Sequence, residues 1–369
     1  MSATAPLASV SVLKKPSNAT TEDNLFLGIV RISCKAWLKM RMFSFRFWIF
    51  SAACCSGWAG VLTAEEASAP GGKAAARAIP LIEKSALVYV DKRECFSCHH
   101  QALAMMALGR SRDAGLEVAE DSIGTQADFS LDYFGGRSKL LAKGKGVPGG
   151  PYNAGYALTG LSMAGESADE VTRALVRYLL KTQSKEGSWR IINHRPPIED
   201  SHFAATALSY RGLQAYAEPE ERKAALGKAL KWLRETEPDS TEDHAFKLLG
   251  LHWGDAAKGK DAGKAARALL DLQRDDYGWA QLPDMASDAY ATAMALFALK
   301  ESGEAGAVPD AVASGEKWLL EHQMKDGSWL VKTRSKPIQR PLDSGFPHGK
   351  HQFISIAATC WAVMALAPR

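Results

Sequence analysis

Cysteine is scarce in most of this sequence, and neither sign of charge dominates it. Cys34, Cys54 and Cys55 lie within residues 1–64, which leaves three cysteines in residues 65–369. Those are too few for a disulfide-built scaffold. Residues 1–64 also hold seven of the 45 basic and two of the 41 acidic residues, so 38 basic and 39 acidic residues remain. Because a nucleic-acid-binding protein needs a basic face, this balance predicts no nucleic-acid partner.

Long apolar runs and alternating patterns are missing as well. A membrane-spanning helix needs about 20 apolar residues in a row, and the longest apolar stretch is shorter and interrupted, so we expect no transmembrane span in the mature chain. No stretch alternates apolar and polar residues long enough to predict a sheet. Hydrophobic residues make up 46% of the chain and charged residues 23%, as in ordinary globular proteins. The remaining class is an all-α globular body.

Residues 1–64 contain what resembles an export signal. Residues 39–46 include three basic residues and no acidic one, residues 47–62 are mostly apolar, and small residues precede Ala64. This order is typical of a signal peptide cleaved after Ala64, with translation starting at Met40 or Met42. We therefore expect an exported protein, either periplasmic or secreted. A membrane anchor and a lipoprotein modified at Cys54 are the alternatives.

The rest of the chain divides into a linker and a body. Residues 65–78 are small and charged, and we expect them to form a flexible linker. The body is expected at residues 79–369.

One motif occurs three times in the body, at residues 179–189, 269–279 and 319–329. Each copy has a leucine pair, a glutamine, a glycine, and a tryptophan six residues after the glutamine. The glutamines are Gln183, Gln273 and Gln323, and the tryptophans are Trp189, Trp279 and Trp329. With a degenerate copy at 230–235, the spacing is roughly 40–50 residues, which is typical of helical-hairpin repeats.

A second pattern, an alanine-rich helix with a small or polar start, lies between these motifs. Six such helices are predicted, beginning at His99, Asn153, Ser201, Thr241, Ser287 and Ile354. Helices with one charged face are predicted at 81–90, 169–182, 220–234, 262–272 and 309–321, and residues 117–142 are the candidate for a sixth. Small residues on every face suit a helix buried all round, whereas a charged face suits an outer helix. The sequence therefore predicts an α/α toroid of about six hairpins with inner and outer rings.

The Gln-Trp motifs resemble the QW repeats of squalene–hopene cyclases and of protein prenyltransferase β subunits. The resemblance covers residues 80–369 and implies the same terpenoid-cyclase fold. In such cyclases an Asp-x-Asp-Asp stretch protonates a polyene. The matching residues here are 240–244, with Glu242 at the place of the proton donor and Asp243 beside it. The first aspartate of the pattern is absent. The competing interpretation is that these acids only stabilise the start of a helix.

The zinc site of prenyltransferases is matched less well. Residues 358–361 resemble its final segment but lack the histidine ligand. The resemblance therefore implies an isoprenoid or other lipid-like small molecule as the ligand more clearly than it implies zinc.

The sharpest motif is Cys-x-x-Cys-His at Cys95, Cys98 and His99. This is the attachment sequence of haem c, in which two thiols bond to the porphyrin and the histidine binds the iron. Covalent haem requires export, which agrees with the leader. The alternatives are a site for zinc or another metal ion that uses the same residues and a redox-active cysteine pair.

The starts of the inner helices should meet at one rim of the toroid, around His99. Asp200, Asp288 and Glu242 are expected there. His100 should point away from the iron, because adjacent helical residues differ by about 100°, and should either hydrogen-bond an acid such as Asp288 or order a ligand. The candidates for a further iron ligand are His202, His244, His348 and His351.

Three functions follow from these features. The first is an exported toroid that carries haem c, with a redox or ligand-binding role and a redox partner. The second is an isoprenoid cyclase or transferase that uses Glu242 and Asp243 as acids. The third is a non-catalytic toroid that binds a lipid or a protein. Whether the chain is an enzyme stays open at this stage.

Overall fold

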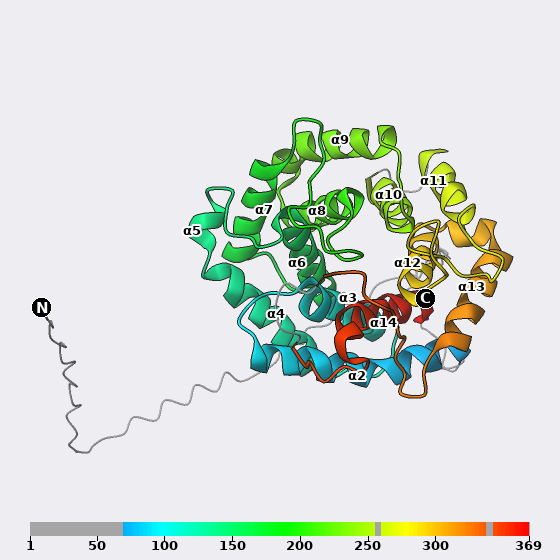
Figure 1. The fold of residues 1–369 in the computed structure, drawn as a ribbon. Coiled ribbons are helices and arrows are strands. Elements are labelled where there is room, and N and C mark those ends of the chain that lie inside the picture. Colours follow the sequence, from blue (N-terminus) through cyan, green and yellow to red (C-terminus); the bar gives the residue numbers. More distant parts are fainter. Residues whose placement is uncertain (1–68, 255–259, 337–341, 369) are drawn as a thin grey trace, which may run out of the picture. The chain divides into compact units, whose positions relative to one another are not determined.

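The computed structural model describes residues 69–254, 260–336 and 342–368. The predicted leader at 1–64 and the first part of the predicted linker lie outside these residues. In the described part, inner and outer helices alternate along the chain and form two concentric rings (Figure 1). The described residues contain no strand beyond a single bridge between Ala280 and Ser287. The predicted all-α toroid is thus confirmed.

Six hairpins build the rings. The outer helices are α2 (Pro70–Lys92), α4 (Glu120–Gly135), α7 (Glu170–Thr182), α9 (Pro219–Glu235), α11 (Lys260–Leu270) and α13 (Pro309–His322). The inner helices are η1 (Cys98–Ala102) continued by α3 (Leu103–Asp113), α6 (Gly150–Ala164), α8 (His202–Tyr216), α10 (Thr241–Gly254), α12 (Ala289–Glu301) and α14 (Gln352–Leu366). Three short helices, α5 (Ser138–Leu141), η2 (Glu304–Ala307) and η3 (Gly349–His351), lie in the connections.

The first outer helix corrects the predicted domain boundary. Helix α2 begins at Pro70, so the boundary at residue 79 falls inside it, and Ala74, Ala75 and Ala78 are fully buried. Alanine is the best helix former, and Pro70 stands at the first helical position, where proline is favoured. The small residues of this segment therefore form a packed helix and not a flexible linker.

Burial separates the two rings as the composition predicts. Every residue of α12 from Ala289 to Leu299 is buried, whereas α7 buries one face and leaves Lys181 and Arg177 exposed. The inner helices therefore form the core, and the outer helices cover it. No helix of the described residues is both long and apolar enough to cross a membrane.

The shared spacing of the three Gln-Trp motifs has a direct structural cause, because each of the three motifs fastens its own hairpin to the next outer helix. Each glutamine Nε2 donates one hydrogen bond within its own turn and one to the following outer helix, at 2.8–3.0 Å. The acceptors in the following helices are the carbonyl oxygens of Ala225 for Gln183, Ala311 for Gln273 and Ala74 for Gln323. The motif is therefore structural, as expected from the resemblance.

The tryptophans connect the same turns to the inner helices. Each indole Nε1 donates to a leucine carbonyl at the end of the preceding outer helix. Each tryptophan backbone N–H donates to a threonine hydroxyl of the next inner helix, namely Thr206, Thr292 and Thr359. The two sequence patterns therefore meet in one contact, in which the Gln-Trp motif supplies the tryptophan and the alanine-rich inner helix supplies the threonine.

The last motif closes the ring. Gln323 donates to the Ala74 carbonyl oxygen of α2 at 2.8 Å. Helix α14 lies beside α2 and α3, and a Cβ on Gly71 would lie 3.0 Å from the Leu366 carbonyl oxygen. The first and last described helices are therefore neighbours.

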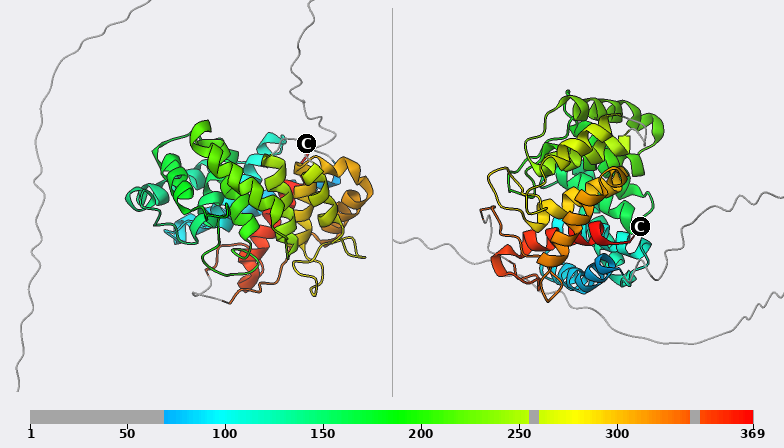
Figure 2. Two further views of the ribbon diagram at one scale, coloured as in Figure 1. Left: turned by 90° about the horizontal axis from the view of Figure 1, so that it is seen from above. Right: turned by 90° about the vertical axis from the view of Figure 1, so that its right-hand side faces the viewer.

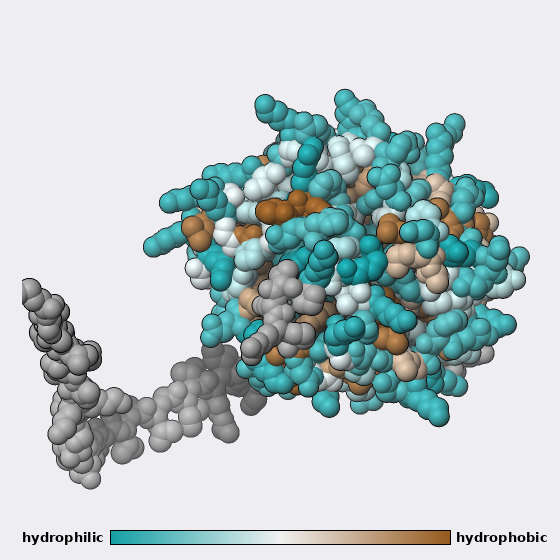
Figure 3. Space-filling view, in the orientation of Figure 1, coloured by the Kyte–Doolittle hydropathy of each residue, from teal (hydrophilic) through white to brown (hydrophobic). Residues whose placement is uncertain are grey.

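The long connections that precede α8, α12 and α14 gather on one side of the rings (Figure 2). Hydrophilic residues predominate on this face, with separate apolar patches between them (Figure 3). The connections hold Asp200, Asp288 and His348, so the predicted rim exists.

Candidate functional site

Helix α10 begins at the rim and places Glu242 inside the ring. The Ser240 side-chain oxygen accepts a hydrogen bond from the Asp243 backbone N–H at 3.1 Å, which caps the helix. Glu242 lies in the first turn, is only 7% exposed, and accepts a hydrogen bond from the Tyr290 hydroxyl at 3.4 Å. Its other carboxyl oxygen, Oε1, is buried and has no hydrogen-bond partner among the described residues. Glu242 is therefore more than a helix-stabilising acid.

Burial raises the pKa of Glu242 well above its usual value, and the charges of Asp243 and Asp200 raise it further. Tyr152 and Tyr156 from α6 and Tyr290 from α12 are fully buried, and burial raises the pKa of each. An ionised Glu242 would raise all three further, because they surround the same interior. Burial therefore favours the protonated form of Glu242 and the neutral forms of the three tyrosines.

Asp243 has a different role from Glu242. Its carboxylate accepts hydrogen bonds from the Ser201 hydroxyl at 2.5 Å and from the Asp239 backbone N–H at 3.2 Å. These contacts fasten the start of α10 to the start of α8. Of the two predicted acids, only Glu242 faces the interior.

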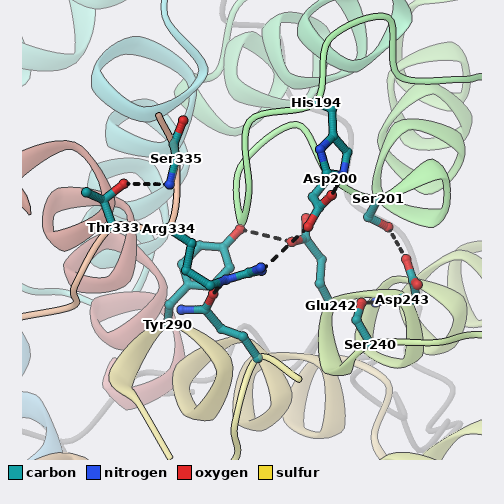
Figure 4. A network of polar contacts seen from close by, with 11 residues as sticks. His194, Asp200, Ser201, Ser240, Glu242, Asp243, Tyr290, Thr333, Arg334 and Ser335 are labelled. Carbon is teal, nitrogen blue, oxygen red and sulfur yellow. Dashed lines mark hydrogen bonds and ion pairs between the residues drawn. The ribbon is translucent and has the colours of Figure 1, made fainter. Parts of the chain in front are cut away.

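A polar bridge crosses the rim above Glu242 (Figure 4). Arg334, from the connection before α14, donates from Nε to Gln281 Oε1 at 2.8 Å and from Nη2 to Asp200 Oδ2 at 3.5 Å. His194 Nε2 lies 2.5 Å from Asp200 Oδ1. Three connections, far apart in sequence, are thus joined over one carboxyl group.

The space beneath this bridge is small. The cavity that contains Glu242 has a volume of about 10 Å³. Its lining consists of Pro197, Ser240, Glu242, Gln281, Tyr290, Ala291, Met294 and Arg334. A larger cavity of about 570 Å³ lies further out on the rim, where Asp239, Asp271, Asp275 and Asp276 give it an acidic lining.

The sequence did not single out His194, Gln281, Tyr290 or Arg334. Tyr290 could have been found, because it occupies the first turn of a predicted inner helix, as Glu242 does. The other three lie in irregular connections, where residue spacing carries no information about which side chains meet.

The two cysteines of the Cys-x-x-Cys-His motif face different surroundings. Cys95 is exposed, and its Sγ lies 3.3 Å from the Tyr89 hydroxyl. Cys98 begins η1, is 5% exposed, and has a pKa that burial raises far above the usual value. Its thiol lies near Tyr152 and Tyr290, whose pKa values it affects. One thiol therefore faces outward and the other faces the interior.

His99 and His100 contact each other and not a rim acid. His99 Nδ1 lies 3.0 Å from the Ser97 hydroxyl oxygen and 2.5 Å from His100 Nδ1. The His100 ring stacks on Tyr89 with ring centroids 4.7 Å apart. The predicted contact between His100 and Asp288 is wrong. His100 lies in the π-helical turn of η1, and its ring is held by Tyr89 of α2 and by His99.

This arrangement does not fit a covalent haem. A porphyrin needs one flat face on which both thiols and the His99 imidazole can meet it. Here Cys98 is buried, Cys95 is exposed, and the His99 ring packs against Phe353 with centroids 5.3 Å apart. Within the described residues, no group of three or more His, Cys, Asp and Glu side chains could hold a metal ion either.

The other predicted ligands have local roles. His202 Nδ1 accepts from the Ile191 N–H, and His351 Nδ1 accepts from the Thr333 N–H. His348 Nε2 lies 2.7 Å from the Ser328 hydroxyl oxygen. His244 is partly buried in the first turn of α10.

Asp288 caps α12 by accepting hydrogen bonds from the Tyr290 and Ala291 N–H groups. Burial raises its pKa to about 6. Asp288 belongs to the rim, as predicted, and its main contacts are those of a helix cap.

Solved structures with the same architecture include terpene cyclases. Type II terpene cyclase MstE from Scytonema, in a complex with merosterolic acid A, aligns with a TM-score of 0.52 and 17% identity, over 80% of this chain and 97% of that one. An ent-copalyl diphosphate synthase from Streptomyces platensis aligns with a TM-score of 0.51 and 18% identity, over 73% of this chain and 50% of that one. No protein-family model and no curated protein matches the sequence. At these identities the likeness establishes a terpene-cyclase-like toroid fold.

Proposed function

We propose that this protein is an isoprenoid cyclase that starts its reaction by proton transfer from Glu242. The observation that carries the proposal is the position of the Glu242 carboxyl, which is buried, faces a tyrosine-lined interior and has a raised pKa. An ordinary glutamic acid is ionised at neutral pH. Burial favours the protonated form of Glu242, which is the form that acts as a general acid.

The reaction would proceed by simple steps. The Glu242 proton and the π electrons of a terminal alkene form a new C–H bond, which leaves a carbocation on the neighbouring carbon. The next double bond attacks this cation and closes a ring, and the final cation loses a proton. The faces of aromatic rings stabilise cations, so the buried Tyr152, Tyr156 and Tyr290 suit such intermediates.

Two further observations support a lipid-like substrate. The Scytonema cyclase of the same fold was solved with merosterolic acid A as its product. The interior of the present toroid is lined by apolar and aromatic side chains. Because the cavity at Glu242 holds only about 10 Å³, the bridge made by Arg334 must part from Asp200 or Gln281 before a polyprenoid can reach the acid.

The test is turnover of defined polyprenoids. Purified protein would be incubated separately with squalene, geranylgeranyl diphosphate and geranylgeranyl dihydroxybenzoate, and extracts would be analysed for cyclised isomers by mass spectrometry. Glu242→Gln keeps the shape of the side chain and removes the proton donor, so it should lower turnover by roughly 10²-fold or more. Glu235→Gln, at the end of outer helix α9, is the matched control. Full activity of the Glu242 variant would contradict the proposal, and a wild-type protein that binds a polyprenoid without converting it would favour the non-catalytic toroid.

Export and a haem-linked redox role rest on the leader and on the Cys-x-x-Cys-His motif alone. If the chain is exported, sequencing of the mature protein should give an N-terminus near Glu65, whereas an intact Ser2 would contradict export. For haem, the packing of Cys98 and His99 leads us to expect no covalently attached pigment when the protein is made with a haem-attachment system. A Soret band that survives acid-acetone extraction would overturn that expectation.

A further inference from the structure

We propose that Trp361 selects an oxygen-bearing isoprenoid by donating its indole N–H to a hydroxyl or carbonyl oxygen of the substrate. The inference rests on the proposed function and narrows its substrate class, from polyprenoids in general to those that carry an oxygen atom. It starts from a donor that the fold leaves without an acceptor. Trp361 is fully buried in α14, and its Nε1 has no hydrogen-bond partner among the described residues.

The Trp361 indole is directed toward the middle of the toroid. In the inner ring of helices, α12 lies between α14 and α10 (Figure 1). The indole nevertheless meets Phe246 of α10 edge to face, with centroids 5.9 Å apart. It also meets Phe297 of α12, with centroids 5.3 Å apart. A side chain of α14 that contacts α10 past the helix between them must extend into the interior.

The aromatic cluster around Trp361 begins one helical turn away from Glu242. Glu242 and Phe246 are four residues apart on α10, so they share one face of the helix and differ by about 6 Å along its axis. Met294 lines the cavity at Glu242, and Phe297 follows it three residues later on α12. Met294 thus lies between the cavity and the cluster, and an unbranched methionine is an adaptable core side chain. A substrate chain that enters at Glu242 and displaces Met294 reaches Trp361 next.

The chemistry of the indole group decides what such a substrate must offer. Buried N–H groups in folded proteins nearly always have an acceptor, which the protein, a water or a ligand supplies. The phenylalanines that surround Trp361 offer at best a weak contact between an N–H and an aromatic face. A hydrocarbon leaves the Trp361 N–H unsatisfied, whereas a hydroxyl or carbonyl oxygen accepts from it. A site built around such a hydrogen bond discriminates against the analogue that lacks the oxygen.

Trp253 also has an indole N–H without a hydrogen-bond partner, but its surroundings differ. It stands in the last turn of α10, at the opposite end of the helix from Glu242, and it is partly exposed. The Arg211 guanidinium carbon lies 5.7 Å from its ring centroid. Trp253 is therefore a matched control, in which the same chemical change falls outside the substrate path.

A pair of ligands and a pair of variants test the contact without turnover. Farnesol and farnesene share one carbon skeleton, and only farnesol carries a hydroxyl group. The affinity for each would be measured by equilibrium dialysis, with cyclodextrin as the carrier, in protein that carries Glu242→Gln so that no proton transfer alters the ligand. Trp361→Phe keeps an aromatic ring and removes the N–H, so it should lower the preference for farnesol over farnesene by roughly tenfold. Trp253→Phe should leave that preference unchanged.

Nuclear magnetic resonance provides a measurement that does not depend on the affinity of a variant. In protein labelled with ¹⁵N-tryptophan, each indole N–H gives its own cross peak, and Trp361→Phe identifies one of them by its loss. Farnesol should move the Trp361 cross peak downfield, as expected for a new hydrogen bond, whereas farnesene should not. The Trp253 cross peak should stay in place with both ligands.

The outcomes separate this inference from the proposed cyclase activity. Equal affinities for farnesol and farnesene with Trp361 intact, or binding of neither ligand, would overturn the role of Trp361 even if a polyprenoid is cyclised. A farnesol preference that survives in Trp361→Phe would overturn it as well, because another group would then hold the oxygen. A preference that Trp361→Phe abolishes supports the inference even if no compound is converted in the turnover assay.

Discussion

Glu242 and Asp243 are adjacent in sequence, yet their surroundings differ in every respect that matters for proton transfer. The Asp243 carboxylate is satisfied by the Ser201 hydroxyl and the Asp239 N–H. The Glu242 carboxyl has one long contact, to Tyr290, and one unpartnered oxygen. A carboxylate with several N–H and O–H donors is stabilised as an anion, whereas a buried one with few donors stays protonated. Position in the first helical turn thus allows both roles, and burial decides between them.

The raised pKa of Glu242 predicts a pH-dependent stability. The folded state holds the proton of Glu242 more tightly than the unfolded state does, so the stabilisation is complete below a pH of about 4.3 and is lost as the pH rises through the folded pKa. Glu242→Gln removes this loss, because the amide does not ionise. The variant should therefore gain stability relative to the wild type as the pH is raised from 4 to 8, measured by urea unfolding at each pH. A difference between the two proteins that does not change with pH would contradict the assigned burial.

At the scale of residues, the sequence identified the acid but not its neighbours. Glu242 follows from its place in the resemblance and at the start of a repeated helix. Arg334, Gln281 and His194 come from three irregular connections, and their meeting depends on ring closure. No local pattern encodes such a meeting, which explains why the bridge above Glu242 appears only in three dimensions.

Three inner helices, α8, α12 and α14, are each connected to the preceding turn through one threonine. Thr292 Oγ1 accepts a hydrogen bond from the Trp279 N–H at 2.9 Å and donates to the Trp279 carbonyl oxygen at 3.3 Å. Both residues are fully buried. The hydroxyl therefore satisfies backbone groups that water cannot reach.

Removal of that hydroxyl should destabilise the protein even though the side chain keeps its volume. Thr292→Val leaves the buried Trp279 N–H without a partner, and the expected loss is about 1–3 kcal/mol in the free energy of unfolding. Thr292→Ser keeps the hydroxyl and serves as the control, with a smaller loss. Urea unfolding with an unchanged denaturant slope is the measurement. A loss in Thr292→Val that is no larger than the loss in Thr292→Ser would contradict the predominant role assigned to the hydroxyl.

Most elements of this fold could be predicted, and the two exceptions have physical causes. The alanine-rich and charged-face patterns predicted the inner helices and five outer helices close to their observed positions. The start of α2 was missed because alanines next to lysine and arginine suit an exposed linker as well as a helix. The π-helical turn of η1 was missed because a turn of five residues leaves no mark in the periodicity, and the contact of His100 with Tyr89 joins residues of two helices that no local pattern relates.

At the scale of the whole molecule, the repeats explain how an all-helical chain positions residues from distant segments with precision. At three of the six hairpin junctions a glutamine fastens one hairpin to the next, and the last of these glutamines reaches the first described helix. The starts of the inner helices consequently meet at one rim, where Glu242, Tyr290 and Arg334 come together. The repeats therefore account for the geometry of the candidate site without contributing to its chemistry.

The hairpins are similar to one another and the ring is closed. We therefore expect the protein to tolerate circular permutation, in which the chain begins at a different hairpin. The described ends already touch, since Gly71 lies against the Leu366 carbonyl oxygen. The permuted chain would start at Ala168 and end at Ser167, with Pro368 joined to Pro70 through about six glycine and serine residues. Its new ends lie in an exposed turn between α6 and α7. The permuted protein should keep the helical circular-dichroism spectrum and a single cooperative unfolding transition, whereas the same chain opened within α12 should lose both. If both permuted proteins unfold alike, contacts along the chain, and not the closure of the ring, maintain this fold.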